Sequence, residues 1–379
     1  MKRSLLLPTL GVVGGLLALS PCAGAQPVQL PEPLSIQDFN QDTGGWISIG
    51  DGTKVLAEHA TENVKEGGGA LRFDYNVAPG NLGALICPVT THSLTTLQSI
   101  SFWVKSNRDT SFIFALQEQN GGRFGTAFSV TANQWQHVEI SPDELVLQKG
   151  NDDPKDANGK LDMAEVEGAA FLDLDLLLAG LAADTNNPLV KLLGLQNGPR
   201  SLYVDDVVFS GKPFGVEAPD KSVLDEFRHP QAAWLKVGAV TLKTVQDAQT
   251  KKGMLQADYP QSTTRLSAFA KLLAPGILAK KQGMSFQMAS RRRATLIVQL
   301  EETSGGKYNA VLQVPADTTP SLQEVKFADF KPSDDSKDNN GRLDLEQVKQ
   351  LLIIDASALL GGADGEGDNT LWLGELRAR

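Results

Sequence analysis

Two acidic loops of this chain carry the residue types that a hard cation binds. Residues 153–162 and 335–344 both contain the series Asp-x-Asn-Gly-x-Leu-Asp. Clustered carboxylate and amide oxygens are the ligands that calcium prefers in proteins. With the glycine of the series at the sixth place of an EF-hand loop, however, Pro154 and Ser336 fall at the first place, where a carboxylate is expected. The EF-hand pattern therefore fails in both loops.

The same loops have a second interpretation, in which their polar residues start a short helix. Asp162 is followed three residues later by Glu165, which is the spacing of a capping box after an Asx turn. Asp344 is followed by Gln347 in the same way. A capping box satisfies backbone N–H groups and needs no metal. We favour this structural role and keep calcium as the alternative.

No arrangement typical of a catalytic centre stands out. The four histidines, His59, His92, His137 and His229, are scattered and show no HExxH spacing. There is no Gly-x-Ser-x-Gly elbow, and the acidic residues are too numerous to nominate a glycosidase pair. Cys87 has no activating neighbour, so we interpret it as a small buried hydrophobic residue. The sequence predicts a protein that is not an enzyme.

Composition limits the classes of partner. The chain has 35 Lys and Arg against 45 Asp and Glu, a formal net charge of −10 at pH 7, which argues against a nucleic-acid partner. Residues 291–293 are three consecutive arginines, which we interpret as a solvated loop. Beyond residue 25 no run of 18 apolar residues occurs, so no membrane span is predicted.

The first 25 residues have the pattern of a secretory signal. Lys2 and Arg3 precede an apolar run, and a small-residue stretch at 23–25 follows it, so we expect a mature chain that starts near Gln26. Cys22 raises a lipoprotein alternative, which the proline before it disfavours. The prediction is an exported protein, periplasmic or extracellular.

The elements that must position any site come in two copies. Residues 69–130 recur at 253–314 with a constant offset of 184. The matched pairs include Leu71 and Leu255, Asp74 and Asp258, Tyr75 and Tyr259, and, at an upstream offset of 188, Trp46 and Trp234. The offset changes only between blocks, as expected for loops of different length. Because solenoid units span only about 20–50 residues, each copy is predicted to be a complete domain.

Within each copy the apolar segments are short, alternating and bounded by turns, as strands are. Residues 71–75 and 138–140 alternate between apolar and polar side chains, which places one set inward and the other toward water. One-sided antiparallel sheets need a second sheet to cover them. The predicted fold class is all-β, with two tandem β-sandwich domains and short helical insertions.

Composition also marks the domain boundary. A Gly- and Pro-containing stretch at 212–221 separates domain 1, predicted at 34–211, from domain 2, predicted at 222–379. Copy one has a 13-residue insertion within 176–198. Its apolar residues fit a short amphipathic helix that packs on its own sandwich, or alternatively one that contacts a partner.

An ordered series of short motifs carries a family resemblance. It comprises Asp38-Phe39, Trp46, Gly-x-Leu-x-x-Asp-Tyr at 69–75, Ser-Phe-x-Val at 101–104, Trp135, the Asp-x-Asn-Gly-x-Leu-Asp loop, and Leu-Tyr-Val-Asp-Asp-Val-Val-Phe at 202–209. The series resembles the galactose-binding-like jelly rolls, and most of all the family 11 type carbohydrate-binding modules and the related domain of complex I intermediate-associated protein 30. The resemblance implies a jelly roll, frequent structural calcium and often saccharide binding.

If the first and last strands of each domain are neighbours, as the resemblance implies, four acids meet in pairs. Asp38 would face Asp206 in domain 1, and Glu226 would face Glu375 in domain 2. Two nearby carboxylates repel each other or share a cation. Structural calcium bound by these four residues is one expectation, and acids fully hydrated on different faces are the other.

Saccharide binding would need an exposed aromatic platform with polar neighbours. Trp46 and Trp234 recur in both copies, as core residues would. Trp103 has no aromatic counterpart in copy two, and Trp103 and Tyr203 are our candidate ligand contacts. The predicted function is reversible saccharide binding without catalysis, with copy one the favoured binder. The alternative is an envelope structural or assembly protein whose sandwiches bind another polypeptide.

Overall fold

The structure is a computed structural model, and it describes residues 35–119, 121–148, 156–181, 196–214, 220, 222–229, 233–274, 276–338, 340–361 and 366–379. The chain divides into two compact units. We call them domain 1, with strands from Ser35 to Ser210, and domain 2, with strands from Val223 to Ala378. The predicted boundaries stay predictions, and the predicted signal peptide lies outside the described residues.

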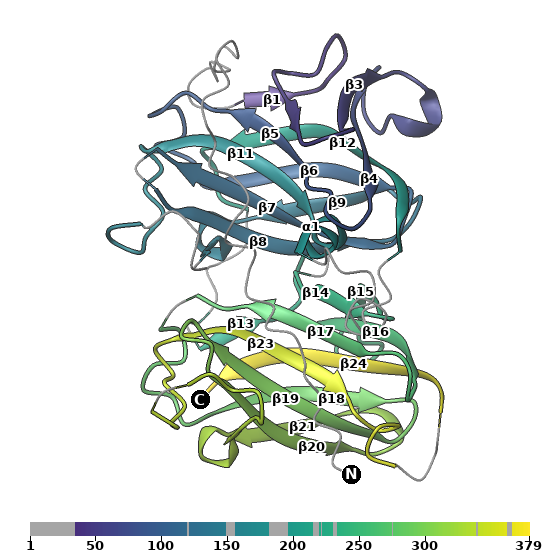
Figure 1. The fold of residues 1–379 in the computed structure, drawn as a ribbon, viewed down its shortest axis with the longest axis vertical. Coiled ribbons are helices and arrows are strands. Elements are labelled where there is room, and N and C mark those ends of the chain that lie inside the picture. The colour runs from purple at the N-terminus through teal and green to yellow at the C-terminus, as the bar shows by residue number, and fades with distance from the viewer. Residues whose placement is uncertain are drawn as a thin grey trace. The chain divides into compact units, whose positions relative to one another are not determined.

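Domain 1 is a sandwich of two antiparallel sheets (Figure 1). The first, named the β12 sheet, has the order β3 (Lys54–Glu58), β4 (Ala70–Val77), β12 (Gly198–Ser210), β6 (Ser99–Ser106) and β9 (Gln136–Ile140), with β1 (Ser35–Gln37) also paired to β12. The second has the order β10 (Val146–Leu147), β8 (Arg123–Val130), β7 (Thr110–Glu118), β11 (Val166–Asp173), β5 (Ala84–Pro88) and β2 (Ile47–Ile49). A single described α-helix, α1 (Leu174–Leu181), follows β11, and two 3-10 turns are η1 (Thr61–Asn63) and η2 (Pro142–Glu144).

Domain 2 repeats the two sheets (Figure 1). The β24 sheet has the order β15 (Thr241–Gln246), β16 (Gly253–Gln261), β24 (Gly367–Ala378), β18 (Gly283–Ser290) and β21 (Asp317–Lys326), with β13 (Val223–Asp225) also paired to β24. Its partner has the order β14 (Leu235–Gly238), β17 (Ser267–Leu272), β23 (Val348–Asp355), β19 (Ala294–Glu302), β20 (Lys307–Val314) and β22 (Lys331–Pro332), and η3 (Phe327–Asp329) follows β21.

These sheets confirm the predicted fold class. Successive strands from β4 to β7 alternate between the two sheets of domain 1, as strands of a jelly roll do. The inward side chains of each sandwich form its own apolar cluster. Trp46 and Trp234, the recurring tryptophans, are fully buried at equivalent places in the two cores. None of the described segments forms a helix of the length and hydrophobicity that a membrane crossing requires.

A glycine at matched positions explains why the chain enters β4 and β16 with the same backbone conformation. Phe39 and Phe227 both have positive φ, +52° and +54°, a conformation that costs a bulky side chain energy. A Cβ atom on Gly69 would collide with the Phe39 carbonyl oxygen, and one on Gly253 with the Phe227 carbonyl oxygen. Each glycine is therefore needed for the chain to enter β4 or β16 beside that phenylalanine.

The helices predicted to follow the two capping boxes do not form. Residues 162–165 make a turn, in which the Glu165 N–H donates to the Asp162 carbonyl at 2.8 Å, and β11 begins at the next residue. Gln347 and Asp344 make the same turn before β23. The prediction was wrong because the residues that follow are buried strand residues, and sheet pairing overrides a local helix signal.

Candidate ligand-binding face

The β12 sheet of domain 1 has an aromatic outer face. Along β12, Leu202 and Val204 belong to the apolar core, so Tyr203 between them points away from it. The same alternation puts Trp103 of β6 on that face, because Phe102 beside it is a core residue. We define the β12 face by these side chains and their neighbours, namely Arg72, Trp103, Lys105, Trp135, His137, Glu139, Tyr203 and Asp205.

The strand register brings both predicted ligand contacts together. Trp103 lies opposite Asp205 of β12 and opposite His137 of β9. Tyr203 lies opposite Lys105 of β6. The two aromatic side chains therefore occupy adjacent strands of one face, as a composite binding surface requires, although their role in binding stays a prediction.

Trp103 is half-buried between charged neighbours. Its ring centroid lies 4.8 Å from that of His137, with the planes inclined by 46°. The Nζ atom of Lys65 lies over the ring, 4.3 Å from its centroid, in a cation–π contact. Nδ1 of His137 lies 3.5 Å from Oε1 of Glu139. An indole with an imidazole and a carboxylate beside it can both stack on a ligand and bond its hydroxyl groups.

Tyr203 is more enclosed than the sequence suggested, with only 9% of its surface exposed. The Lys105 ammonium lies 4.8 Å from the tyrosine ring centroid, and the Arg72 guanidinium carbon lies 5.9 Å from it. The same ammonium lies 5.2 Å from the ring centroid of Trp135. Lys105 thus fixes two rings, and the half-buried Trp103 and Trp135 offer a ligand more surface than Tyr203 does.

A loop between β3 and β4, residues 59–69, is fastened across part of the β12 face. The buried Asp205 carboxylate accepts hydrogen bonds from the backbone N–H groups of Lys65 and Glu66, at 2.8 and 2.9 Å. Nζ of Lys105 donates to Oδ1 of Asn63 at 2.7 Å. Burial raises the pKa of Asp205, and the backbone donors oppose that rise. The loop therefore forms one boundary of the face.

The predicted acid pair of domain 1 lies at the end of the β1–β12 pairing, in which Gln37 lies opposite Val207. Burial raises the pKa of Asp206, and the negative charges of Glu66 and Asp38 raise it further. The Asp38 carboxylate is itself engaged, because Oδ2 accepts a hydrogen bond from Nδ2 of Asn40 at 2.7 Å.

The predicted pair of domain 2 has basic partners instead. Glu226 forms an ion pair with Arg228. Glu375 pairs with Arg377 and, at 3.3 Å, with Lys252, and the Arg377 hydrogen bond lowers the pKa of Glu375. Across the described residues there is no group of three or more His, Cys, Asp or Glu side chains that could hold a metal ion. The domain 2 acids fit calcium poorly, since arginine and lysine already balance their charge. Structural calcium stays a prediction.

The two acidic loops satisfy their own polar groups where they are described. Nδ2 of Asn158 donates to the Asp162 carboxylate at 2.8 Å, and the Asp162 N–H donates to the buried Glu118 carboxylate at 2.5 Å. Asn340 and Glu302 bond Asp344 in the same way, at 2.9 and 2.5 Å. These contacts fit a structural role for the two loops, which end in turns and not in the short helices that we predicted.

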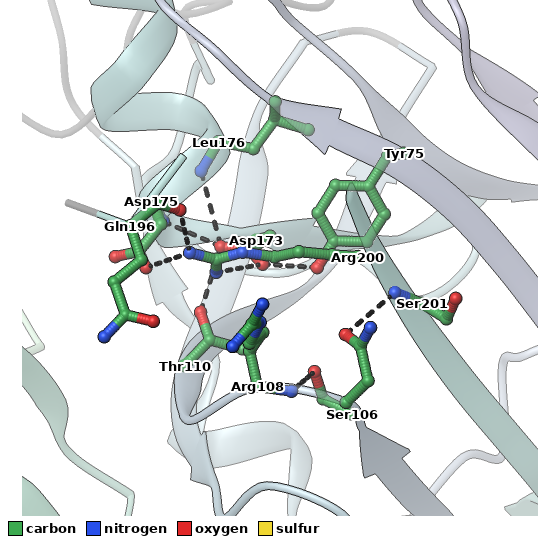
Figure 2. Close-up of polar contacts among 11 residues, drawn as sticks. Tyr75, Ser106, Arg108, Thr110, Asp173, Asp175, Leu176, Gln196, Arg200 and Ser201 are labelled. Atoms are coloured by element: carbon green, nitrogen blue, oxygen red, sulfur yellow. Dashed lines mark hydrogen bonds and ion pairs between the residues drawn. The ribbon is translucent and has the colours of Figure 1, made fainter. Parts of the chain in front are cut away.

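A buried ionic group at one end of domain 1 holds the start of α1 (Figure 2). Asp173, at the end of β11, accepts hydrogen bonds from the Tyr75 hydroxyl, from Thr110 at 3.0 Å and from Arg200 at 3.1 Å. Its Oδ1 also accepts the Asp175 N–H at 2.7 Å, as a helix N-cap does. Because Asp173 and Arg200 are 1% and 2% exposed, the group cannot reach a substrate and is structural.

Other residues of the face had weaker signals in the sequence. His137 and Glu139 lie two residues apart on β9, and the alternation of residues 138–140 could have placed them beside Trp103. The offset that pairs Asp206 with Glu375 also pairs Tyr203 with Trp372, so the sequence already gives domain 2 an aromatic residue at the matching place.

Cys87 is buried as predicted, and burial raises the pKa of its thiol to about 12. Residues 188–193, the part of the insertion that fits a short amphipathic helix, lie outside the described residues.

Comparison with known proteins gives structural likenesses only. No protein-family model matches the chain, and no curated protein sequence matches it significantly. A family 11 carbohydrate-binding module from Clostridium thermocellum, in complex with a beta-1,3-1,4-mixed-linked tetrasaccharide, is 16% identical and covers 48% of this chain and 96% of its own, with a TM-score of 0.34. The CBM22-1–CBM22-2 tandem domain of Paenibacillus barcinonensis Xyn10C is 11% identical and covers 91% of this chain and 96% of its own, with a TM-score of 0.29. What those proteins bind is a property of those proteins, and the assignment for this chain depends on its own residues.

Proposed function

We propose that this chain is an exported, non-catalytic protein that binds a saccharide reversibly on the β12 face of domain 1. The observation that carries the proposal is the gathering of three aromatic rings, those of Trp103, Trp135 and Tyr203, on one sheet face together with charged side chains. Apolar sugar faces pack on aromatic rings, and convergent polar groups fix their orientation. The motif series of the sequence supports the same class of ligand.

Each side chain of the face has a separate role in binding the saccharide. Trp103 and Trp135 supply half-exposed ring surface for stacking. Glu139 accepts hydrogen bonds from sugar hydroxyl groups, and His137 beside it donates or accepts one. Lys105 lies between the rings of Tyr203 and Trp135 and fixes both on the same face. No bond of the ligand is made or broken in this scheme.

The Lys65 ammonium over Trp103 does not prevent stacking. A cation–π contact at an exposed position contributes about 0.5–1 kcal/mol. Lysine carries its charge on a flexible stem. A sugar ring can therefore replace the ammonium on the indole, and the displaced charge remains near the ligand.

Binding of purified residues 26–379 to a panel of soluble and insoluble polysaccharides tests the proposal. We expect binding to at least one of them, and we expect Trp103→Ala to weaken it at least tenfold while Trp103→Phe retains most of it. The melting curve of each variant serves as the folding control. Absence of binding to every glycan would overturn the proposal and favour the envelope-assembly alternative, in which the sandwiches bind another polypeptide. Cell fractionation of the full chain tests export.

A further inference from the structure

Domain 2 keeps an aromatic residue on the equivalent sheet face but lacks the two cations that lie beside it in domain 1. Trp372 of β24 lies opposite Gln256 of β16 and Ala289 of β18. In domain 1 the matching tyrosine lies opposite Arg72 and Lys105. The two cations that enclose the ring in domain 1 are thus replaced by an amide and a methyl group.

Trp372 is half-buried and held by neutral partners. Its Nε1 donates to Oε1 of Gln256 at 3.2 Å. Nε2 of Gln256 in turn donates to Asp258 at 2.8 Å, and the Thr370 hydroxyl donates to the same carboxylate at 2.8 Å. Nζ of Lys243 lies 3.6 Å from that carboxylate and balances its charge. The ring is therefore oriented by a chain of hydrogen bonds with no unbalanced charge.

The loop that crosses the domain 1 face has no counterpart of equal length in domain 2. The connection between β15 and β16 has six residues, 247–252, against eleven, 59–69, between β3 and β4. Asp247 closes the shorter connection on itself by accepting the Thr250 N–H at 2.5 Å. Gly374 stands where domain 1 has Asp205, so the carboxylate that fastens the longer loop is also missing. A longer side chain at Gly374 would press on Gln287 and Met254, whose atoms lie 3.3 Å from a Cβ placed there.

The surface beside Trp372 combines apolar and amide groups. Gln287 of β18, the counterpart of Trp103, lies opposite Leu322 of β21. Leu322 is 51% exposed, one of three large hydrophobic side chains with high exposure among the described residues. An indole, an exposed leucine and two glutamine side chains thus lie along one sheet face.

We infer that this face of domain 2, defined by Gln256, Gln287, Leu322 and Trp372, is a second ligand site, and that it takes a neutral saccharide. A pyranose ring has apolar C–H faces that suit Trp372 and Leu322, and its hydroxyl groups suit amides that both donate and accept hydrogen bonds. None of these four residues offers a cation to a carboxylate or sulfate, and Lys243 beside them is already paired. The charges of the β12 face make that face different, so the two copies recognise different features of a glycan. The choice of a saccharide rests on the proposed function.

The test compares four forms of residues 26–379, namely the wild type, Trp372→Ala, Trp103→Ala and the double variant. The probes are mixed-linked β-glucan, xylan and β-1,4-galactan as neutral polysaccharides, with polygalacturonate as the charged counterpart. For a neutral probe that binds, we expect Trp372→Ala to weaken binding at least tenfold and, in calorimetry with its oligosaccharide, to lose one site per chain. Polygalacturonate binding should not change in Trp372→Ala.

Two more variants separate binding from folding. Trp372→Phe keeps a ring and should retain most of the affinity, whereas Gln287→Ala removes only an amide and should weaken binding several-fold with an unchanged melting curve. The inference is overturned if neutral binding and site number are the same in Trp372→Ala as in wild type. If Trp103→Ala alone abolishes binding, the proposed function survives and this inference fails. If only Trp372→Ala weakens saccharide binding, the proposed site on domain 1 fails. If the protein binds a polypeptide and none of the glycans, the proposed function and this inference are both overturned.

Discussion

Asp205 accepts a hydrogen bond from the backbone N–H of Lys65, 140 residues away in the sequence, at 2.8 Å. Hydrogen bonds to charged groups contribute about 1.5–3 kcal/mol each. We expect Asp205→Ala to lower the free energy of unfolding by about 2 kcal/mol and to make the 59–69 loop sensitive to trypsin at Lys65. Denaturant titration and limited proteolysis measure the two effects. Asp205→Asn keeps an acceptor and is the control, and equal cleavage of wild type and Asp205→Ala would show that the loop is held by other contacts.

Removing the ammonium over Trp103 should strengthen saccharide binding. Lys65→Ala deletes a contact of about 0.5–1 kcal/mol that a stacked sugar ring would have to displace. The expected result is a two- to five-fold lower Kd for the polysaccharide that domain 1 binds. Lys54→Ala, on the edge strand of the same sheet, removes the same charge without the ring contact and controls for net charge. A weaker or unchanged affinity in Lys65→Ala alone would mean that the ammonium contacts the ligand or has no part in binding.

Glu118 should make domain 1 less stable as the pH rises. Burial raises the pKa of this carboxyl to about 7, against the opposing hydrogen bond from the Asp162 N–H. A raised pKa in the folded state means that the stabilising effect of protonation is complete below about pH 4.5 and is lost as the pH rises through 7. Glu118→Gln keeps the acceptor and removes the charge, so we expect it to stabilise the protein by about 1–3 kcal/mol at pH 8 and to change little at pH 4.5.

Unfolding titrations between pH 4.5 and 8 measure this slope. Glu302→Gln is the matched variant, because burial also raises the pKa of Glu302 and the Asp344 N–H occupies the same place in domain 2. Both variants should flatten the pH dependence. A Glu118→Gln protein with the wild-type slope would contradict the prediction.

Substitution of Arg200 should destabilise domain 1 more than most other single substitutions. It is 2% exposed and pairs with Asp173 at 3.1 Å and with Asp175 at 2.7 Å. Loss of one partner of a buried ion pair leaves an uncompensated charge and costs about 3–5 kcal/mol. We therefore expect Arg200→Met to lower the free energy of unfolding by that amount, measured by urea titration.

Domain 2 supplies the matched control for Arg200. Asn369 stands at the same place in β24, and its Nδ2 donates to the Tyr259 hydroxyl at 3.1 Å. Asp355, the counterpart of Asp173, is bound by Tyr259 at 2.7 Å and by Gln261 at 3.1 Å. Because these donors are neutral, Asn369→Ala should cost clearly less than Arg200→Met. Similar losses in the two variants would contradict the ionic explanation.

The strands and the core were accessible from the sequence because they depend on local periodicity. The alternation of residues 71–75 and the constant offset between copies were enough to place Tyr75 and Tyr259 in their cores. The same logic failed at Asp162 and Asp344. There a local capping signal competed with strand pairing formed by distant residues, and the pairing decided the outcome.

The surroundings of the predicted site were not accessible, since they come from loops and from long-range register. Nothing near Trp103 in the sequence indicates that Lys65 covers its ring, and nothing near Tyr203 indicates that Lys105 and Arg72 enclose it. The basic partners of Glu226 and Glu375 likewise reduced the case for calcium in domain 2. The residue types predicted the aromatic contacts, whereas the long-range contacts of the fold determine how much of each ring is exposed.

The position of β12 and β24 has a consequence for the order in which the protein can be made. Each is the last strand of its domain in sequence, yet each lies inside its sheet, β12 between β4 and β6 and β24 between β16 and β18. A sheet cannot close around a strand that the ribosome has not yet released. Domain 1 must therefore wait for residue 210 and domain 2 for residue 378, so neither sandwich can complete its central sheet pairing before its last strand has been made.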